Sequence, residues 1–126
     1  MKFTEHRDSN ILTVKQYRPG LVKINEFEID SSCFLSQHEL NSDWNCPSLD
    51  ALDENHLKAL FALKPDVIIL GTGERQIFPD PSLFRFCAQN GIGLEVMDNA
   101  AACRTYNVLT TEDRNIVLGL IMAKPE

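Results

Sequence analysis

The segment from Asp66 to Asp98 constrains the fold of this chain more than any other. It begins with the apolar run "VIIL", residues 67–70, turns at two glycines, restarts after Pro81 as an amphipathic segment and ends in "GLEVMD". An uninterrupted apolar run is typical of a central strand that is covered on both faces, as in parallel sheets. The segment therefore predicts a right-handed strand–helix–strand unit inside an α/β fold.

The N-terminal third of the chain has the pattern of a β meander. Residues 10–18 alternate and are rich in strand formers, and Pro19-Gly20 closes them as a turn. In "LVKINEFEID" the apolar positions change parity, which places a tight turn near Asn25-Glu26. A third strand is expected from Phe27 through "SSCFLSQ", with an irregularity at Ser31-Ser32.

Helical patterns predict the remaining elements. A helix over 53–63 follows a polar loop whose one large apolar residue, Trp44, is expected to pin the loop to the body of the protein. Later helices are expected after the caps Asp80, Asn99 and Thr110, the last of them over "TEDRNIVLGLIMA". The sequence thus predicts a three-layer α/β fold, in which an N-terminal β meander joins a central mixed sheet flanked by helices.

The length of the chain, 126 residues, fits one domain. Hydrophobic residues make up 44% and charged residues 24%, which is ordinary for a globular protein. We therefore expect a single domain over residues 1–126, with flexible ends at 1–9 and 124–126.

Charge and hydropathy exclude several classes of partner. The net charge is −6 and the twelve Lys and Arg residues are dispersed, which argues against a nucleic-acid-binding or anionic-membrane-binding surface. The N-terminus has no apolar core segment, and the longest apolar runs are too short to span a bilayer. These features predict a cytoplasmic protein without membrane insertion.

The cysteines do not form a metal-binding pattern. Cys33, Cys46, Cys87 and Cys103 lie far apart, without a C-x-x-C motif or a histidine at ligand spacing. In a reducing compartment they are expected to be free thiols that act mostly as small core residues. The sequence predicts neither a metal site nor a cofactor.

Gly71 and Gly73 raise the question of a phosphate-binding loop. A dinucleotide fingerprint needs a third glycine at residue 76, which is Gln, and a helix that starts at once, whereas the next helix waits until Pro81. A Walker loop also fails, because no Gly-Lys-Ser/Thr follows. The glycines are better interpreted as a turn with positive φ or a close backbone contact.

A weaker binding hypothesis concerns the edge of the sheet beyond these glycines. In open α/β sheets, ligands collect beyond the carboxyl ends of parallel strands. Two such ends, residues 71–73 and 98–99, should be neighbours here. The 71–75 loop and the 98–104 helix start would then frame a shallow pocket for a small polar or anionic ligand.

The candidate ligand-binding residues all lie at or next to these two strand ends. They are Gly71, Thr72, Gly73, Glu74, Arg75, Asn99, Cys103 and Arg104. For the charged members, a Glu–Arg ion pair that only fixes the loops is favoured over ligand binding. Cys103 is the one candidate nucleophile, because the helix dipole and Arg104 would lower the pKa of its thiol. No partner base lies at a motif spacing, so no catalytic residue is assigned and an enzyme is not favoured.

Two segments carry a resemblance to a known family. They are "LGTGERQIF" and "GIGLEVMDNAAACRTYNVLTTEDRNIVLGLI", which includes Glu112 and Arg114. Over residues 10 to 122 the chain resembles DUF498, a family of small domains with the Mth938-like fold. Its members include mitochondrial complex I assembly factor 3, and its bacterial members have no established reaction. The resemblance implies a three-layer β/α fold with a central mixed sheet.

The resemblance also implies action through protein partners. We therefore expect a non-enzymatic binding or assembly-factor-like module, in the assembly of membrane or respiratory complexes. The alternative is a small-ligand protein or enzyme that uses the pocket described above. The runs "VIIL" and "IVLGLIM" hold more apolar residues than one face of a helix or strand can carry. Some of them are candidates for the surface of a homo-oligomer.

Overall fold

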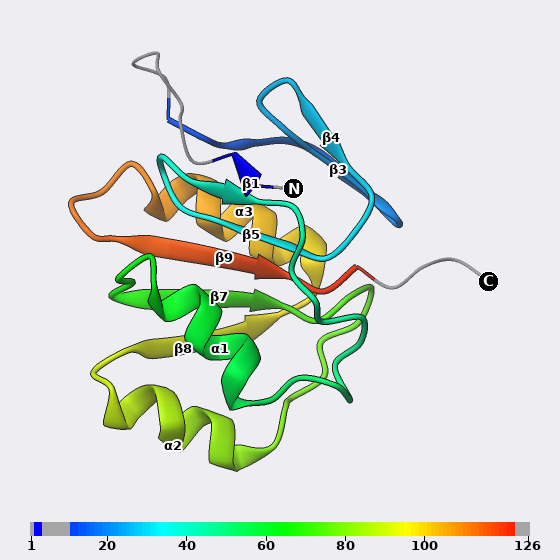
Figure 1. The fold of residues 1–126 in the computed structure, drawn as a ribbon. Helices are drawn as coiled ribbons and strands as arrows, with labels where there is room; N and C mark the ends of the chain where they lie inside the picture. The colour runs from blue at the N-terminus through cyan, green and yellow to red at the C-terminus, as the bar shows by residue number, and fades with distance from the viewer. Residues whose placement is uncertain (1, 4–10, 123–126) are drawn as a thin grey trace.

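The computed structural model describes residues 2–3 and 11–122, which form two β-sheets and three helices (Figure 1). The expected flexible ends, 1–9 and 124–126, lie outside these residues except for 2–3. The elements in chain order are β1 (Lys2–Phe3), β2 (Val14–Arg18), β3 (Leu21–Ile24), β4 (Phe27–Ile29), β5 (Cys33–Leu35), β6 (Leu40–Asn41), α1 (Glu54–Phe61), β7 (Val67–Gly71), α2 (Pro81–Gln89), β8 (Gly93–Met97), α3 (Asn99–Leu109) and β9 (Ile116–Leu120).

The larger sheet is mixed, as predicted. Its six strands lie in the order β1-β6-β5-β9-β7-β8. The central strand β7 pairs in parallel with both β8 and β9, whereas β5 pairs antiparallel with β9 and β6. The meander β2-β3-β4 forms a separate antiparallel sheet of three strands. The predicted strand–helix–strand unit is therefore β7-α2-β8.

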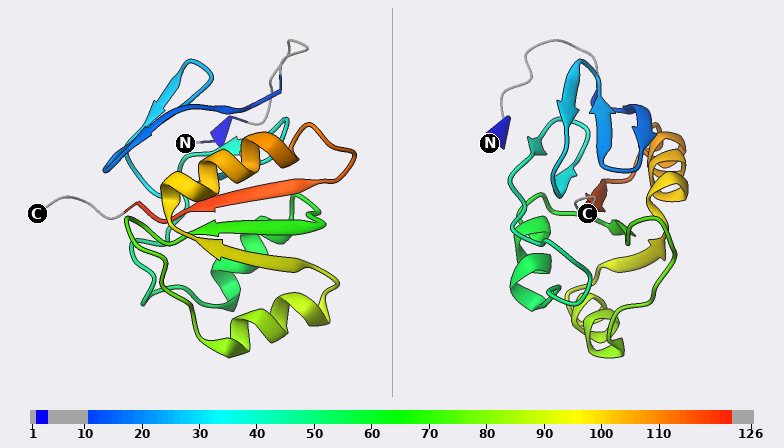
Figure 2. Two further views of the ribbon diagram at one scale, coloured as in Figure 1. Left: turned by 180° about the vertical axis from the view of Figure 1, so that it is seen from behind. Right: turned by 90° about the vertical axis from the view of Figure 1, so that its right-hand side faces the viewer.

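Alternate residues of the central strands point into two separate cores. Ile69 of β7 and Leu118 of β9 belong to the core beneath α3 and the small sheet. Ile68 and Leu70 of β7 belong to the core beneath α1 and α2. Figure 2 shows the same division, with the six-stranded sheet between these two sets of elements. The predicted three-layer α/β fold is confirmed.

Local signals placed several element boundaries correctly. The turn expected near Asn25-Glu26 joins β3 to β4, and Asn25 takes the left-handed conformation with φ of 51°. The strand expected from Phe27 onward breaks at Ser31-Ser32, where the chain passes from the small sheet to the large one. Asp80 caps α2 by accepting a hydrogen bond from the Ser82 amide.

The loop between β6 and α1 is pinned by Trp44, as predicted. The indole N–H donates to the carbonyl oxygen of His56 at 3.2 Å. The ring is buried and packs edge-on against Phe34, with 6.0 Å between the ring centroids. His56 also completes a capping box with Asp53 at the start of α1. This loop is therefore part of the core.

The helix predicted after Thr110 is wrong, because Ile116–Leu120 forms the strand β9. All five residues of β9 are buried, between β5 and β7. Periodicity alone does not separate a short buried strand from a buried helix. Gly119 was the available sequence signal, because glycine is unfavourable inside a helix. In β9 a Cβ at this position would lie 3.0 Å from Leu60 and 3.3 Å from Trp44. Thr110 instead occupies the C-cap of α3.

Candidate functional site

The carboxyl ends of β7 and β8 meet at one edge of the large sheet, as predicted. The Thr72 amide donates to the carbonyl oxygen of Met97 at 3.0 Å, and the Asn99 amide donates to that of Gly73 at 2.8 Å. The loop after β7 and the first turn of α3 are thus joined through their backbones. Figure 2 shows both at the same end of the parallel strands.

Asn99 is not the cap of α3, which corrects the sequence prediction. Asp98 is the N-cap and accepts a hydrogen bond from the Ala101 amide at 2.8 Å. Asn99 follows as the first helical residue and is only 1% exposed. The preceding aspartate competes equally well for the cap on sequence grounds, because Asp and Asn are similar N-cap residues. The Asn99 side chain is consequently available for another role.

The side-chain amide of Asn99 forms hydrogen bonds to three other segments. Its Oδ1 accepts from the Gly73 amide at 3.0 Å. Its Nδ2 donates to the carbonyl oxygen of Ile121, just after β9, at 3.0 Å, and to the hydroxyl of Tyr17 in β2 at 3.2 Å. One buried side chain therefore holds the ends of β7 and β9, the start of α3 and the small sheet in register.

The two glycines have the conformational roles expected of them. A Cβ at Gly71 would lie 2.2 Å from Oδ1 of Asn99 and 2.8 Å from Leu120, so this position needs glycine for close contact. Gly73 has a φ of 102°, which L-residues rarely adopt. The loop after β7 therefore needs Gly71 for close packing and Gly73 for its backbone conformation.

Hydrogen bonds also fix the residues after Gly73. The Thr72 hydroxyl donates to the carbonyl oxygen of Arg75 at 2.5 Å and accepts from the Ile77 amide at 3.1 Å. The Gln76 amide group donates to the carbonyl oxygen of Val96 in β8 at 3.0 Å. Thr72 and Gln76 thus make the loop between β7 and α2 an ordered structure.

This ordered loop presents two apolar side chains to solvent. Ile77 is 49% exposed and Phe78 is 65% exposed. We call this pair the apolar tip. The sequence analysis missed it, although an Ile-Phe pair in a stretch otherwise made of charged, polar and proline residues was a visible signal.

Glu74 bonds to Tyr17 and not to an arginine. The Tyr17 hydroxyl donates to the Glu74 carboxylate, and burial together with this contact raises the pKa of Tyr17 above its usual range. Among the described residues, Glu74 forms no ion pair with Arg75 or Arg104. The predicted Glu–Arg ion pair is therefore wrong, and Tyr17 is a site residue that sequence reasoning missed.

Cys103 does not have the electrostatic environment predicted for a nucleophile. Its side chain is 4% exposed, and burial raises the pKa of the thiol to about 12 despite the nearby Arg104 cation. The expected lowering by the helix dipole and Arg104 is wrong, because loss of hydration outweighs both. All four cysteines are buried, and none forms a disulfide within the described residues.

The rest of the "AACRTYN" segment anchors the small sheet to α3. The Tyr106 hydroxyl donates to the carbonyl oxygen of Leu12 at 2.9 Å. The Asn107 side chain accepts from the Val14 amide at 2.9 Å and donates to the Val14 carbonyl oxygen at 2.8 Å. Asn107 thereby pairs with β2 as a neighbouring strand would.

An open depression of about 290 Å³ lies between β2 and α3. Its lining includes Lys15, Gln16, Tyr17, Cys103, Arg104 and Asn107. The loop residues 71–75 and Asn99 do not line it, although Glu74 and Asn99 both form hydrogen bonds to Tyr17, which does. The structure thus brings Gly71, Thr72, Gly73 and Asn99 together in one group, and Cys103 and Arg104 in another.

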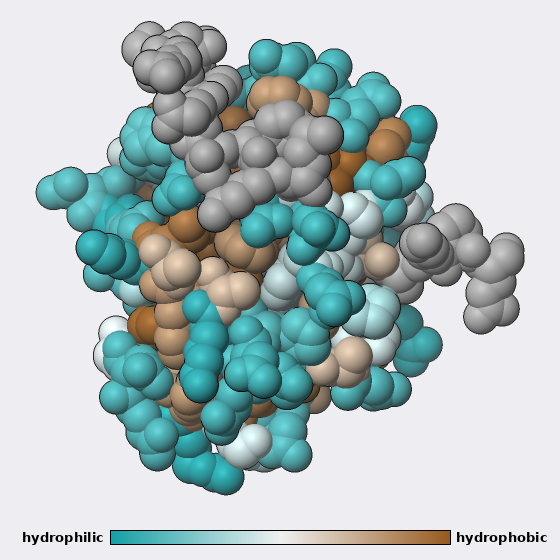
Figure 3. Space-filling model, in the orientation of Figure 1, coloured by the Kyte–Doolittle hydropathy of each residue, from teal (hydrophilic) through white to brown (hydrophobic). Residues whose placement is uncertain are grey.

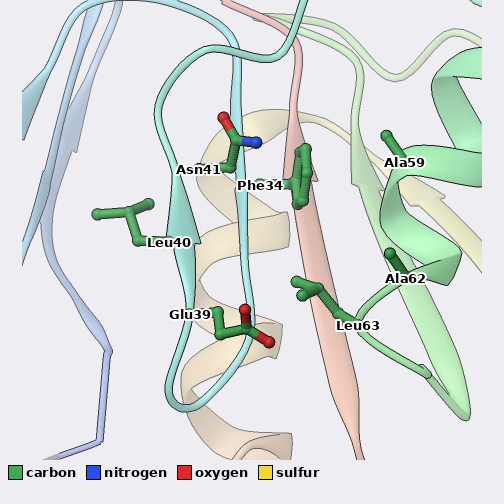
Figure 4. Close-up of a pocket in the computed structure, with 7 residues that line it drawn as sticks. All are labelled: Phe34, Glu39, Leu40, Asn41, Ala59, Ala62 and Leu63. Carbon is green, nitrogen blue, oxygen red and sulfur yellow. The ribbon is translucent and has the colours of Figure 1, made fainter. Parts of the chain in front are cut away.

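A second depression, of about 220 Å³, lies between α1 and the β5–β6 hairpin (Figure 4). The Phe34 ring faces Ala59 of α1 and Ala62, the C-cap of that helix, while Glu39 stands at the edge and Leu40 points away. In Figure 3, apolar side chains gather on this face of the molecule within a mostly polar surface. The sequence analysis did not predict this groove.

No helix within residues 2–3 and 11–122 has the length and apolar character that crossing a membrane requires.

A similar protein from Francisella tularensis subsp. holarctica is named a 13 kDa major membrane protein. It is 30% identical over 103 residues, which cover 81% of this chain and 84% of that protein.

Other relatives are named for the assembly of a respiratory complex. The NADH dehydrogenase [ubiquinone] 1 alpha subcomplex assembly factor 3 of Xenopus tropicalis is 35% identical over 80 residues, covering 62% of this chain and 44% of that protein. The human protein of the same name is 30% identical over 114 residues, covering 89% of this chain and 60% of that protein. The chain thus spans about half the length of these assembly factors.

Solved structures show the same fold. A solution structure of a Xanthomonas campestris protein has a TM-score of 0.85 and 40% identity, and covers 100% of this chain and 96% of that one. A Mth938-like domain from Bordetella pertussis has a TM-score of 0.79 at 24% identity, covering 97% of this chain and 92% of that one. The predicted Mth938-like fold is confirmed.

Residues 14–121 match the family described as "Protein of unknown function (DUF498/DUF598)". This range runs from the first residue of β2 to the residue after β9. The resemblance found in the sequence is confirmed, and the protein belongs to the DUF498/DUF598 family.

Proposed function

We propose that the protein is a non-enzymatic binding module that acts through a partner protein in the assembly of a membrane-associated respiratory complex. The names of its relatives support the process, since several are assembly factors for NADH dehydrogenase. The observation that carries the binding role is the apolar tip, Ile77 and Phe78, on a loop held by hydrogen bonds.

The apolar tip has the properties of a protein-docking element. Single exposed apolar side chains, such as Val108, are common on protein surfaces, whereas adjacent ones that form a continuous apolar patch more often mark an interaction site. An aromatic anchor that enters a pocket of the partner is a typical centre of binding energy. Because Thr72 and Gln76 already order the loop, docking loses little conformational entropy.

The environment of Cys103 supports a non-enzymatic role. A thiol with a pKa near 12 is protonated at neutral pH, and the protonated form is a poor nucleophile. Tyr106 and Asn107, which lie on the same helix face, make hydrogen bonds to the backbone of Leu12 and Val14. These side chains hold the fold together.

The test replaces the apolar tip and measures partner capture. Val108 offers a matched control, because it is 65% exposed, as Phe78 is, but lies on α3. The Ile77→Ser/Phe78→Ser variant should lose a partner that the unaltered chain and Val108→Ser both recover from the native cell extract, quantified by mass spectrometry. Equal recovery by all three chains, or no reproducible partner for any, would contradict the proposal.

A further inference from the structure

Two cations converge on the open depression between β2 and α3. Lys15 extends from β2 and Arg104 from α3, and both are exposed and line the same space. The lining contains no carboxylate, although the chain as a whole carries a net charge of −6. This depression is therefore a local concentration of positive charge on an acidic protein.

The charges of Lys15 and Arg104 are not neutralised by neighbours. Neither side chain forms an ion pair or a hydrogen bond with a described residue. Glu74, the acidic residue bonded to Tyr17, does not line the depression. The buried Cys103 thiol is protonated at neutral pH and adds no negative charge. Both cations are thus available to an incoming anion.

The frame that holds the two cations is rigid. Asn107 bonds to both backbone groups of Val14, the residue before Lys15, so the edge of β2 is fixed against α3. Tyr106 adds a hydrogen bond to Leu12 at the same junction. The positions of the Lys15 and Arg104 backbones are therefore set before any ligand arrives, and only their side chains must be ordered.

The shape of the depression favours a side chain of a protein over a free metabolite. Metabolite pockets usually enclose most of the ligand surface, whereas this depression is small and open to solvent. An Asp or Glu side chain needs only local contact, and the Arg104 guanidinium matches a carboxylate with two parallel hydrogen bonds. The open shape weakens such a contact little, because the rest of the partner protein shields the carboxylate from solvent.

We infer that Lys15 and Arg104 receive carboxylate side chains from an acidic segment of the partner protein. This inference rests on the proposed function, which supplies a protein as the occupant. Tyr17 lines the depression and bonds to Glu74 in the loop that carries the apolar tip, so one partner surface can cover both features. The acidic contacts then add charge specificity to apolar docking.

The test uses an acidic peptide, acetyl-Ala-Glu-Glu-Ala-Glu-Glu-Ala-amide, and its counterpart with Gln in place of Glu. In titrations of the nitrogen-15-labelled full chain, the acidic peptide should shift the amide resonances of Lys15, Gln16 and Arg104, and the Gln peptide should not. Arg104→Glu should weaken binding about tenfold or more. Arg85→Glu, which alters an exposed cation of α2 on the other side of the large sheet, should leave binding unchanged.

A carbodiimide coupling reaction gives a second measurement on the unaltered chain. It joins the peptide carboxylates to lysine amines that lie beside them, and Lys15 should couple in clear excess over the exposed Lys58 of α1. Equal coupling at both lysines, or shifts with the Gln peptide of the same size, would overturn the inference. Shifts produced as strongly by succinate alone would also overturn it, in favour of a small-anion site.

Failure of this inference can be distinguished from failure of the proposed function. The Ile77→Ser/Phe78→Ser variant should bind the acidic peptide as the unaltered chain does, since the apolar tip does not line the depression. If the peptide binds and the tip variant still captures the partner, the docking role of the tip fails alone. If the tip variant loses the partner and the peptide does not bind, the carboxylate contact fails alone.

Discussion

Asn99 occupies the space that a side chain at Gly71 would need, because a Cβ at Gly71 would lie only 2.2 Å from Oδ1 of Asn99. The same oxygen accepts the hydrogen bond from the Gly73 amide. The glycine and the asparagine are therefore one structural unit, although they are separated by the whole of α2 and β8. Close packing of this pair explains the first glycine of the loop without a phosphate ligand.

Gly71→Ala is expected to lower the free energy of unfolding by about 1–3 kcal/mol, since the methyl group displaces the Asn99 side chain or the end of β9. Urea denaturation followed by circular dichroism measures this loss. Gly93→Ala is the matched control, because a Cβ there would have its nearest neighbour at 3.5 Å. If the two variants unfold at the same urea concentration, Asn99 does not occupy the position described.

Asn99→Ala should cost about 1–3 kcal/mol, because it leaves the Gly73 amide and the Ile121 carbonyl oxygen without their partner. It also removes the atom that a methyl group at residue 71 would strike. The Gly71→Ala/Asn99→Ala double variant should therefore lose less stability than the sum of the single losses. Simple additivity in the double-mutant cycle would contradict the contact.

The buried thiols predict a fall in stability in alkaline solution. Burial raises the pKa of Cys33 and of Cys103 to about 12 each, from 9.0. Because the unfolded chain ionises first, the stabilising effect is fully present below about pH 9 and is lost as the pH rises from there towards 12. Each thiol contributes a slope of at most about 1.4 kcal/mol per pH unit in this range.

The measurement compares urea unfolding of the unaltered chain and of Cys103→Ala at about pH 8 and at about pH 10.5. The variant should lose less stability between the two conditions, since one of the ionising groups is absent. Parallel losses would mean that the Cys103 thiol is not desolvated as the structure indicates. A reagent for free thiols should also react with the folded chain far more slowly than with the chain in urea.

The sequence was sufficient for the parts of the fold that depend on local signals. The "VIIL" run, the Asp80 cap and the turn at Asn25 each depend on a few neighbouring residues, and each is confirmed. The sequence was insufficient where contacts with distant segments determine the secondary structure. β9 is a strand because β5 and β7 flank it, and the residues of β9 themselves carry no information about these neighbours.

The candidate site shows the same division between local and distant information. The meeting of the two strand ends followed from the topology of parallel strands and is confirmed. The partner of Glu74 could not be predicted, because Tyr17 lies 57 residues away and reaches it only through the packing of the small sheet on α3. The pKa of Cys103 depends on its burial, which sequence proximity to Arg104 does not reveal.

Gly119→Ala tests the tight contact of β9 with α1 and with the loop that carries Trp44. The new methyl group would lie 3.0 Å from Leu60 and 3.3 Å from the Trp44 ring, so one of the two must move. We expect a loss of about 1–3 kcal/mol in the free energy of unfolding. Trp44 fluorescence should shift to longer wavelength as the ring is displaced, and an unchanged spectrum with unchanged stability would contradict this packing.

Asn107 offers a graded test of the junction between α3 and β2. Asn107→Ala removes both hydrogen bonds to Val14 and should cost about 1–3 kcal/mol. Asn107→Asp keeps an acceptor for the Val14 amide but loses the donor to the Val14 carbonyl oxygen, so its cost should be intermediate. Hydrogen exchange at the Val14 amide reports the difference directly: protection should be lost in the alanine variant and partly retained in the aspartate variant. Equal protection in all three chains would show that Asn107 does not complete the edge of β2.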